Sequence, residues 1–318
     1  MSKCMKYILL LMLLTLVLIL IDQYSQEETE IINDPLQVYF CPREDCLRPF
    51  MEILNRSTSS IHCALYDLTS PEIASLLQEK SKTEEVKLVI DEHNTFPGAK
   101  KVPKDKTMHN KFCIIDRTIT TTGSLNPTPS GFEENNNNFL IVHSKRIAAN
   151  YEDEFKELFA GKFDGGEKTA QPIIRLNNET IETYFCPEDE CEKKVVGEVS
   201  NAKESILFMT FSFTSSEISD AIVLSGVPYR GIFEKSQISD YSEYTSLKNV
   251  RVDGNPSLMH HKVFIIDNAT VITGSFNPTQ NGNAHNDENI MIIHDAELAK
   301  KYVNEFEMLW REAKESNS

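Results

Sequence analysis

One set of chemically reactive residues occurs twice in the chain at the same spacing. Residues 108–128 read MHNKFCIIDRTITTTGSLNPT, and residues 259–279 read MHHKVFIIDNATVITGSFNPT. Twelve of the 21 aligned positions are identical, and no gap is needed. The shared polar residues are His109, Lys111, Asp116, Ser124 and Asn126 in the first copy, and His260, Lys262, Asp267, Ser275 and Asn277 in the second. Each copy therefore supplies an imidazole, an ammonium group, a carboxylate, a hydroxyl and an amide.

These side chains suit the cleavage of a phosphodiester. The lysines place positive charge where negative charge gathers in the transition state, and serine and asparagine add substrate-phosphate binding through hydrogen bonds. Two histidines, each with an unperturbed pKa near neutrality, provide a nucleophile and a general acid. Because one copy alone lacks one of these two roles, we expect the copies to face each other across a pseudo-twofold axis and to form one composite site.

Strand parity explains how the residues of one copy come together. Alternate side chains of an extended strand share a face, so His109 and Lys111 project together. A hairpin turn is expected at Asp116, and the returning strand ends at Ser124 beside the His-Lys end. The second copy repeats this arrangement.

The repeat extends over most of the chain. The segment YFCPREDC at 39–46 is answered by YFCPEDEC at 184–191, and IHCALYDLTSPEIASLL by ILFMTFSFTSSEISDAI. We expect a first module at residues 31–164, a linker at 165–173 and a second module at 174–318, preceded by an N-terminal segment of residues 1–30.

Alternating strand and helix patterns predict an α/β fold, with mixed β-sheets flanked by helices in each module. The expected strands of the first module are 38–41, 61–68, 86–91 and 139–143. Its expected helices are 46–55, one that begins after Ser70, and 146–161, which Gly161 ends. The second module repeats this order and finishes with a helix at 296–314.

The cysteine spacing is compatible with an oxidising compartment. A C-x4-C pair occurs twice, at Cys41–Cys46 and at Cys186–Cys191, and each pair can close a small disulfide loop. The alternative is one four-cysteine zinc site that draws on both pairs, although the spacing is wider than the C-x2-C of zinc knuckles. Cys63 and Cys113 lie in apolar strand-like runs, where we expect inert core thiols.

The N-terminal segment contains an apolar run, Tyr7–Ile21, with Lys3 and Lys6 before it and acidic residues after it. The run approaches the roughly 20 residues that a helix needs to cross a bilayer. No small-residue cleavage site follows it, so we expect an uncleaved, single-pass membrane anchor. Its flanking charge places the N-terminus in the cytoplasm and the catalytic region outside it. A cleaved signal peptide, which would give a secreted protein, is the alternative.

The doubled pattern H-x-K-x4-D, followed by G-S-x-N, resembles the phospholipase D superfamily, and the layout of short modules resembles its endonuclease-like branch. The similarity covers nearly everything from about residue 36 onward. It implies a covalent phosphohistidine intermediate, which water or an alcohol then attacks, without a metal or other cofactor. It also implies that Asp116 and Asp267 mostly support the fold, and that a monomer contains the whole pseudo-dimer.

The two copies differ downstream of the repeated pattern. The superfamily often carries an Asn-x-Glu element whose carboxylate hydrogen-bonds a catalytic histidine. The second copy has this element at 286–288, ending in Glu288, whereas the first copy has Asn137 at the equivalent position. An amide orients an imidazole, but it does not stabilise the positive charge of the ring as a carboxylate does.

This difference predicts unequal roles for the two histidines. We expect His260, backed by Glu288, to be the stronger base and the nucleophile, and His109 to be the general acid. Glu133 or Glu134 is an alternative source of a carboxylate for the first copy.

The charge pattern bears on the substrate. The formal net charge of -16 disfavours a protein that coats nucleic acid non-specifically. Before the first motif, however, the segment 98–111 could form a local phosphate-binding lip. Its lysines are Lys100, Lys101, Lys104 and Lys106. We expect a nuclease that hydrolyses DNA or RNA. The alternatives are a phospholipase D or phosphatidyl transferase that acts on membrane phospholipid, and a non-catalytic relative that binds polyanions.

Overall fold

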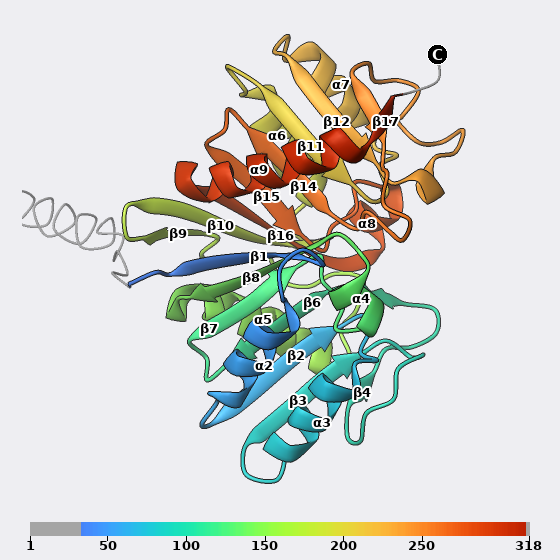
Figure 1. Cartoon of the computed structure of the whole chain (residues 1–318). Coiled ribbons are helices and arrows are strands. Elements are labelled where there is room, and N and C mark those ends of the chain that lie inside the picture. The colour runs from blue at the N-terminus through green and yellow to red at the C-terminus, as the bar shows by residue number, and fades with distance from the viewer. Residues whose placement is uncertain (1–32, 316–318) are drawn as a thin grey trace, which may run out of the picture.

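The computed structural model describes residues 33–315, and the elements of these residues repeat in two halves (Figure 1). The first half contains β1 (Leu36–Cys41), α2 (Leu47–Asn55), β2 (Ser60–Leu65), α3 (Pro71–Lys80), β3 (Glu85–Ile90), β4 (Lys100–Lys101), β5 (Thr107–Met108), β6 (Lys111–Ile115), β7 (Ile119–Gly123), α4 (Pro129–Glu133), β8 (Asn137–His143) and α5 (Lys145–Ala160). The second half contains β9 (Ile173–Leu176), β10 (Glu179–Cys186), α6 (Cys191–Ser200), β11 (Ile206–Thr210), α7 (Ser216–Leu224), β12 (Tyr229–Phe233), the 3-10 helix Lys235–Gln237, β13 (Val250–Val252), β14 (Lys262–Ile266), β15 (Thr270–Gly274), α8 (Gln280–Ala284), β16 (Asn286–His294), α9 (Ala296–Glu312) and β17 (Lys314–Glu315).

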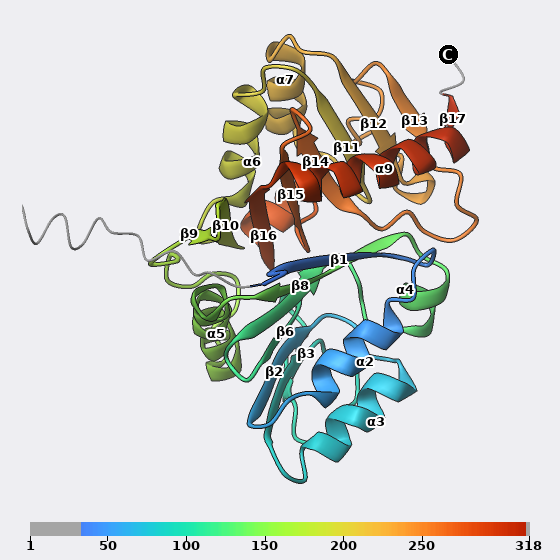
Figure 2. The same ribbon diagram turned by 60° about the vertical axis from the view of Figure 1, so that its left-hand side comes forward.

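Each half builds one mixed sheet. The first sheet has the order β1-β8-β7-β6-β2-β3-β4, and the second has the order β17-β13-β12-β11-β14-β15-β16-β10-β9. In the first sheet β2 pairs with β3 in parallel and with β6 antiparallel, and in the second β11 pairs in the same way with β12 and β14. The expected α/β class with mixed sheets and flanking helices is therefore confirmed, and Figure 2 shows the two sheets stacked one above the other.

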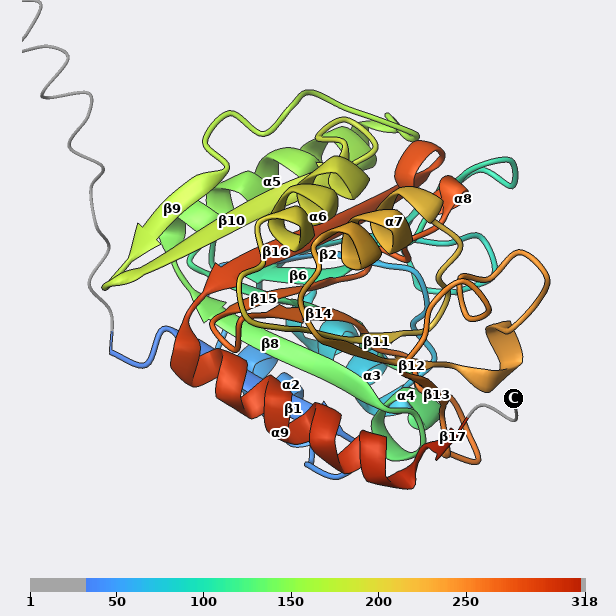
Figure 3. The same cartoon turned by 90° about the horizontal axis from the view of Figure 1, so that it is seen from above.

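The helices of the first half cover opposite faces of its sheet. Ser70 begins α3 as predicted, because its side chain accepts a hydrogen bond from the backbone N–H of Ile73. Helices α2 and α3 bury Leu54, Ile73 and Leu77 in a core of the first half alone. Helix α5 belongs instead to a core that both halves share, which also contains residues of α9. Seen from above, α5 and α9 lie on opposite sides of the molecule with the strands between them (Figure 3).

The repeated motif forms the expected hairpin in each half. Asp116 and Arg117 have φ values of 51° and 56°, and the corresponding Asp267 and Asn268 have 55° and 52°. Two consecutive residues with positive φ are the signature of the tight turn that matches the twist of paired strands. The turns join β6 to β7 and β14 to β15, so each returning strand runs back toward its histidine.

Three disulfides close in the described residues. Cys41–Cys46 and Cys186–Cys191 are bonded as predicted, with Cα–Cα distances of 5.8 and 5.6 Å, so each pair has its partner within its own half. The expectation that Cys63 and Cys113 are free thiols is wrong, because these residues form the third disulfide. They lie directly opposite each other on the antiparallel strands β2 and β6, with their Cα atoms 4.1 Å apart. Sequence spacing does not reveal such a cross-strand pairing.

The prediction of a single-pass membrane protein is corrected by the structure. None of the helices found between residues 33 and 315 is long and apolar enough to cross a bilayer. The apolar run Tyr7–Ile21, on which that prediction rested, lies outside the described residues.

Candidate active site

The first half-site is built where β6 begins. His109 lies two residues before the strand, and Lys111 is the first residue of the strand. The Lys111 Nζ atom donates a hydrogen bond to the backbone carbonyl of His109 at 2.7 Å. The second half repeats this geometry at the start of β14, where the Lys262 Nζ atom lies 2.9 Å from the His260 carbonyl oxygen. Each lysine therefore stays beside the histidine of its own half.

Backbone hydrogen bonds join the two half-sites reciprocally. The N–H group of His109 donates to the carbonyl of Asp287 at 2.9 Å, where β5 pairs in parallel with β16. The N–H group of His260 donates to the carbonyl of Asn136 at 2.9 Å, beside the bridge between Asn136 and Met259. The segment that carries each histidine is thus hydrogen-bonded to residues of the other half, which brings the two half-sites together.

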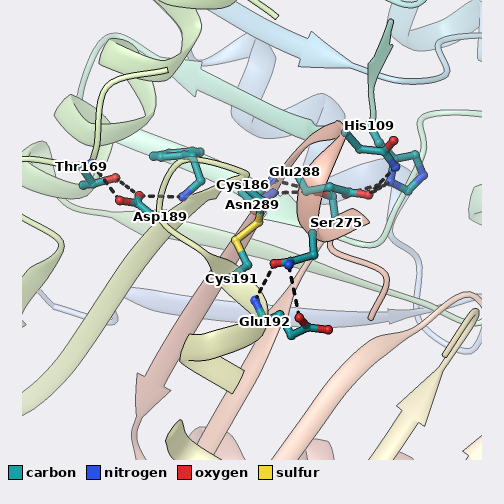
Figure 4. Close-up of a disulfide and its surroundings, with 12 residues drawn as sticks. His109, Thr169, Cys186, Asp189, Cys191, Glu192, Ser275, Glu288 and Asn289 are labelled. Atoms are coloured by element: carbon teal, nitrogen blue, oxygen red, sulfur yellow. Dashed lines mark hydrogen bonds and ion pairs between the residues drawn. A yellow bond between two sulfur atoms is a disulfide. The ribbon is translucent and has the colours of Figure 1, made fainter. Parts of the chain in front are cut away.

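The side chain of each histidine also has its hydrogen-bond partner in the other half. Both carboxylate oxygens of Glu288 lie 2.8 Å from the Nδ1 atom of His109, as Figure 4 shows. The Nδ1 atom of His260 lies 2.9 Å from the Asn137 side-chain oxygen and 3.1 Å from the carbonyl oxygen of Ser124. The expectation that Glu288 backs His260 is therefore wrong. The start of β16 lies across the boundary between the halves, so its carboxylate reaches the histidine of the other copy.

Burial lowers the pKa values of all four basic groups, and neighbouring positive charges add to the shift for three of them. Burial lowers the pKa of His109 to about 4, with Glu288 opposing the shift and both lysines adding to it. Burial lowers the pKa of Lys111 to about 7. Burial and the neighbouring positive charges also lower the pKa values of His260 and Lys262 well below their usual range. An anion bound beside these groups would favour their charged forms.

An aromatic ring supports the histidine and lysine in each half. Tyr66 contacts the ring of His109 at a centroid distance of 4.7 Å, and the Lys111 Nζ atom lies 5.1 Å from its centroid. Phe211 has the same relation to the second half-site, at 4.7 Å from the ring of His260 and 4.9 Å from the lysine nitrogen. The sequence analysis missed both rings, although the aligned segments that follow the second strand of each module place them opposite each other.

Comparison with known proteins agrees with this geometry. A family model described as "Cardiolipin synthase, PLD-like domain" matches residues 95–159 and 195–310, which is more than half of the chain. The chain belongs to the phospholipase D superfamily. It is accordingly a phosphodiester hydrolase of that superfamily.

Individual relatives match different shares of the chain. The chain is 32% identical over 139 residues to a protein named phospholipase D from Rickettsia prowazekii, an alignment that covers 41% of this chain and 68% of the relative. It is 34% identical over 119 residues to a mitochondrial cardiolipin hydrolase from Xenopus tropicalis, covering 35% of this chain and 57% of that protein. The structure of phosphatidylserine synthase from Haemophilus influenzae covers 90% of this chain and is itself covered to 88%, with 10% identity and a TM-score of 0.67. This last likeness shows that the arrangement of two halves recurs as a fold.

The aspartates of the superfamily motif lie away from the histidines, in the hairpin turns. The Asp116 carboxylate accepts hydrogen bonds from the backbone N–H groups of residues 58–60. The Asp267 carboxylate does the same with residues 203–205. Burial alone would raise the pKa of Asp267, but these hydrogen bonds lower it. This placement fits the supporting role that the superfamily resemblance implies.

The motif serines are buried and bonded within their own half. The Ser124 hydroxyl donates to the Asn137 side-chain oxygen at 3.1 Å and accepts from the backbone N–H of Asn138 at 3.0 Å. The Ser275 hydroxyl accepts from the backbone N–H of Asn289 at 2.9 Å. These bonds fix the strands that carry Asn137 and Glu288. Contact between a substrate phosphate and Ser124, Asn126, Ser275 or Asn277 stays a prediction.

Each C-x4-C disulfide lies beside the residue that supports a histidine. Cys41 is the register partner of Asn137 between β1 and β8, and Cys186 is the register partner of Glu288 between β10 and β16. The bond Cys186–Cys191 is therefore close to the Glu288–His109 contact, as Figure 4 shows. The two loops brace the strand ends on which the composite superfamily site depends.

Two of the four lysines of the expected lip are paired with acidic side chains. Lys106 forms an ion pair with Asp164, and the Nζ atom of Lys104 lies 3.6 Å from the carboxylate of Glu92. The Nζ atom of Lys101 lies 3.4 Å from the backbone carbonyl of Glu92. The positive charge of the lip is thus reduced before any substrate arrives.

Proposed function

We propose that this protein hydrolyses phospholipids through a covalent phosphohistidine formed at His109. The observation that carries the nucleophile assignment is the contact of both Glu288 oxygens with His109 Nδ1. The carboxylate orients the ring and stabilises the positive charge that develops on it during attack. His260, whose Nδ1 faces only an amide oxygen and a carbonyl, then serves as the general acid. This assignment reverses the roles expected from the sequence.

The proposed reaction has two balanced steps. The Nε2 atom of His109 attacks phosphorus, the bond from phosphorus to the leaving oxygen breaks, and His260 gives its proton to that oxygen. A water molecule then gives its proton to His260 and attacks phosphorus, which breaks the bond between phosphorus and His109. Lys111 and Lys262 stabilise the additional negative charge on the phosphoryl oxygens in both transition states.

Charge around the site supports a lipid substrate over a nucleic acid. Binding along a nucleic-acid backbone gains its affinity from many lysines and arginines that release counterions from the phosphates. Here two of the four lip lysines form ion pairs with acidic side chains, and the basic groups of the two half-sites lie close together at one place. One phosphodiester needs no more than these groups. The naming of the Rickettsia relative as a phospholipase D is consistent with this choice.

A nuclease is the second candidate. Lys100 and Lys101 form no ion pair with a carboxylate in the part of the chain that the structure describes, so a short polynucleotide could still contact them. The non-catalytic alternative is disfavoured, because both histidines and both lysines are present and face one site.

The test uses the full-length protein with vesicles of phosphatidylcholine or cardiolipin and, separately, with single-stranded DNA and RNA. We expect release of the lipid headgroup and loss of turnover in both His109→Asn and His260→Asn. Cleavage of nucleic acid without cleavage of lipid would overturn the proposed substrate. Turnover in either histidine variant would overturn the composite mechanism. Labelled phosphate trapped on His260 in place of His109 would reverse the proposed roles.

A further inference from the structure

Two equivalent glutamates of the repeat have opposite surroundings. Glu154 on α5 and Glu305 on α9 are 151 residues apart, the same offset that separates the two histidines, and their exposed fractions are only 7% and 1%. The Glu305 carboxylate forms an ion pair with Arg43 and lies 3.2 Å from the Nε2 atom of His261. A buried carboxylate in the second half therefore has its positive partner.

Glu154 of the first half has no corresponding arginine. Arg43 follows Cys-Pro in the first cysteine loop, and the residue at that position of the second loop is Glu188. The Glu188 side chain lies beside Glu154 and brings a second carboxylate in place of the guanidinium. Glu157 completes the group: one oxygen from each of these three residues lies within 4.8 Å of the others. Glu305 therefore has a guanidinium beside it, whereas Glu154 has two additional carboxylates beside it.

Buried oxygens without hydrogen-bond donors extend this group. Among the described residues, Glu188 Oε2, Asp164 Oδ1 and Asp287 Oδ2 are buried and have no hydrogen-bond partner. Asp287 is only 2% exposed, and its other carboxylate oxygen accepts a hydrogen bond from the backbone N–H of Asp164 at 2.8 Å. Such oxygens cost free energy unless a proton or a cation satisfies them.

The group is also accessible to an ion. A cavity of about 370 Å³ is lined by Glu154, Glu157 and Glu167. Lys156 and Lys168 also line it, and their Nζ atoms lie 2.8 Å from Asp153 and 3.8 Å from Glu190. The Nζ atom of Lys162 lies 3.2 Å from Glu157, at the outer end of the group, and 3.4 Å from the exposed Glu167. Carboxylate oxygens are the ligands that Ca²⁺ prefers, and 4.8 Å is about twice a Ca²⁺–oxygen distance of roughly 2.4 Å.

We propose that Glu154, Glu157 and Glu188 bind a divalent cation, with Ca²⁺ as the preferred ion, in the place beside Glu154 that corresponds to the place of Arg43 beside Glu305. The ion is a structural one. It lies next to the strand that carries Asp287, whose carbonyl accepts the hydrogen bond of the His109 N–H, and Glu288, which holds the His109 ring. Binding would therefore stiffen the strand end that positions His109, without contact with the reacting atoms.

A second group of possible ligands, Glu182, Glu198 and His294, provides the contrast. Both ring nitrogens of His294 are already engaged, by Thr270 at 2.9 Å and by Glu182 at 3.1 Å. That group contains its own positive partner, so it needs no added ion. Glu182→Gln is therefore the matched control for a change of carboxylate to amide.

The experiment measures the unfolding temperature and calorimetric binding of the full-length protein after removal of bound metal with EGTA. Added Ca²⁺ is expected to raise the Tm of the wild type by about 5 °C at saturation. The double variant Glu154→Gln/Glu188→Gln should lose this rise, whereas Glu182→Gln should keep it. Glu188→Arg, which copies Arg43, should also lose the rise and should be at least as stable as the wild type in EGTA.

Three outcomes would overturn the proposal. One is a wild-type Tm that neither Ca²⁺ nor Mg²⁺ changes up to about 10 mM, the weak limit for protein Ca²⁺ sites. Another is equal Ca²⁺ binding by the wild type and the double amide variant, which also decides the matter if Glu188→Arg fails to fold. A response to Mg²⁺ alone would overturn the choice of Ca²⁺. None of these results depends on the substrate of the active site.

Discussion

Glu288 of the second half holds His109 of the first, with both carboxylate oxygens 2.8 Å from the Nδ1 atom of the ring. The reciprocal contact is an amide, since Asn137 of the first half lies 2.9 Å from the Nδ1 atom of His260. The pseudo-twofold site is therefore symmetric in its histidines and lysines but asymmetric in the groups behind them. This asymmetry is the physical basis for assigning unequal roles to two nearly identical half-sites.

Glu288→Gln should lower kcat by roughly 10²–10⁴-fold, because the amide cannot stabilise the charge that develops on His109 during attack. The rate of phosphoenzyme formation in a rapid-quench experiment is the decisive measurement. Asn137→Gln is the matched control, because it lengthens the support of His260 without changing its charge. A control that slows phosphoenzyme formation as much as Glu288→Gln would contradict the proposed division of roles.

Lys111→Met should change the pH dependence of stability. Burial lowers the folded-state pKa of Lys111 to about 7, whereas the unfolded value is about 10.4. Between these values the unfolded chain binds more protons, so the contribution of Lys111 to stability rises with pH, by at most about 1.4 kcal/mol per pH unit. The free energy of unfolding of Lys111→Met should exceed that of the wild type by the largest amount near pH 7, and this difference should disappear by about pH 10.

Denaturant unfolding of the ligand-free protein at several pH values measures this difference directly. Comparison of the two proteins cancels the other titrating groups, including Asp287, whose raised pKa acts in the opposite direction. A stability difference that does not change between pH 7 and pH 10 would refute the interpretation.

Removal of one disulfide should mainly lower stability, and removal of another should mainly lower activity. Cys63 and Cys113 are 50 residues apart, so their bond closes a long loop, and Cys63→Ala/Cys113→Ala should cost about 4 kcal/mol of unfolding free energy. Cys186→Ala/Cys191→Ala opens a loop of separation 5 and should cost only about 2 kcal/mol. Cys186 lies opposite Glu288 on the neighbouring strand, however, so Cys186→Ala/Cys191→Ala should show the larger decrease in kcat of the two variants. Parallel measurements of denaturant unfolding and kcat test this, and equal losses of kcat would contradict it.

Tyr66 should act through its ring and not through its hydroxyl. Its counterpart in the second half is Phe211, and both rings contact a histidine at 4.7 Å. Tyr66→Phe should therefore keep kcat within about threefold, whereas Tyr66→Ala should lower it about tenfold by releasing His109 and Lys111. Steady-state kinetics on the preferred lipid measures both effects. A Phe variant as impaired as the Ala variant would assign a role to the hydroxyl.

Much of the site was predictable because its signals are local. The period-2 alternation placed His109 and Lys111 together at one strand end, and the turn residue Asp116 predicted the hairpin that forms. Helix α3 begins after Ser70 as expected. The C-x4-C pairs closed as disulfides because five residues of separation leave few other partners within reach.

What the sequence by itself determined was the fold class, the doubled half-sites and the chemistry of their side chains, since these depend on residues near one another in the chain. The tertiary structure decided which strand lies against which. It placed Glu288 behind His109 instead of His260, and it paired Cys63 with Cys113 across two strands. It also placed Glu188 beside Glu154, whereas Arg43 lies beside the corresponding Glu305. Periodicity fixes the face of a strand that a residue occupies, but the packing of the two halves chooses its neighbour.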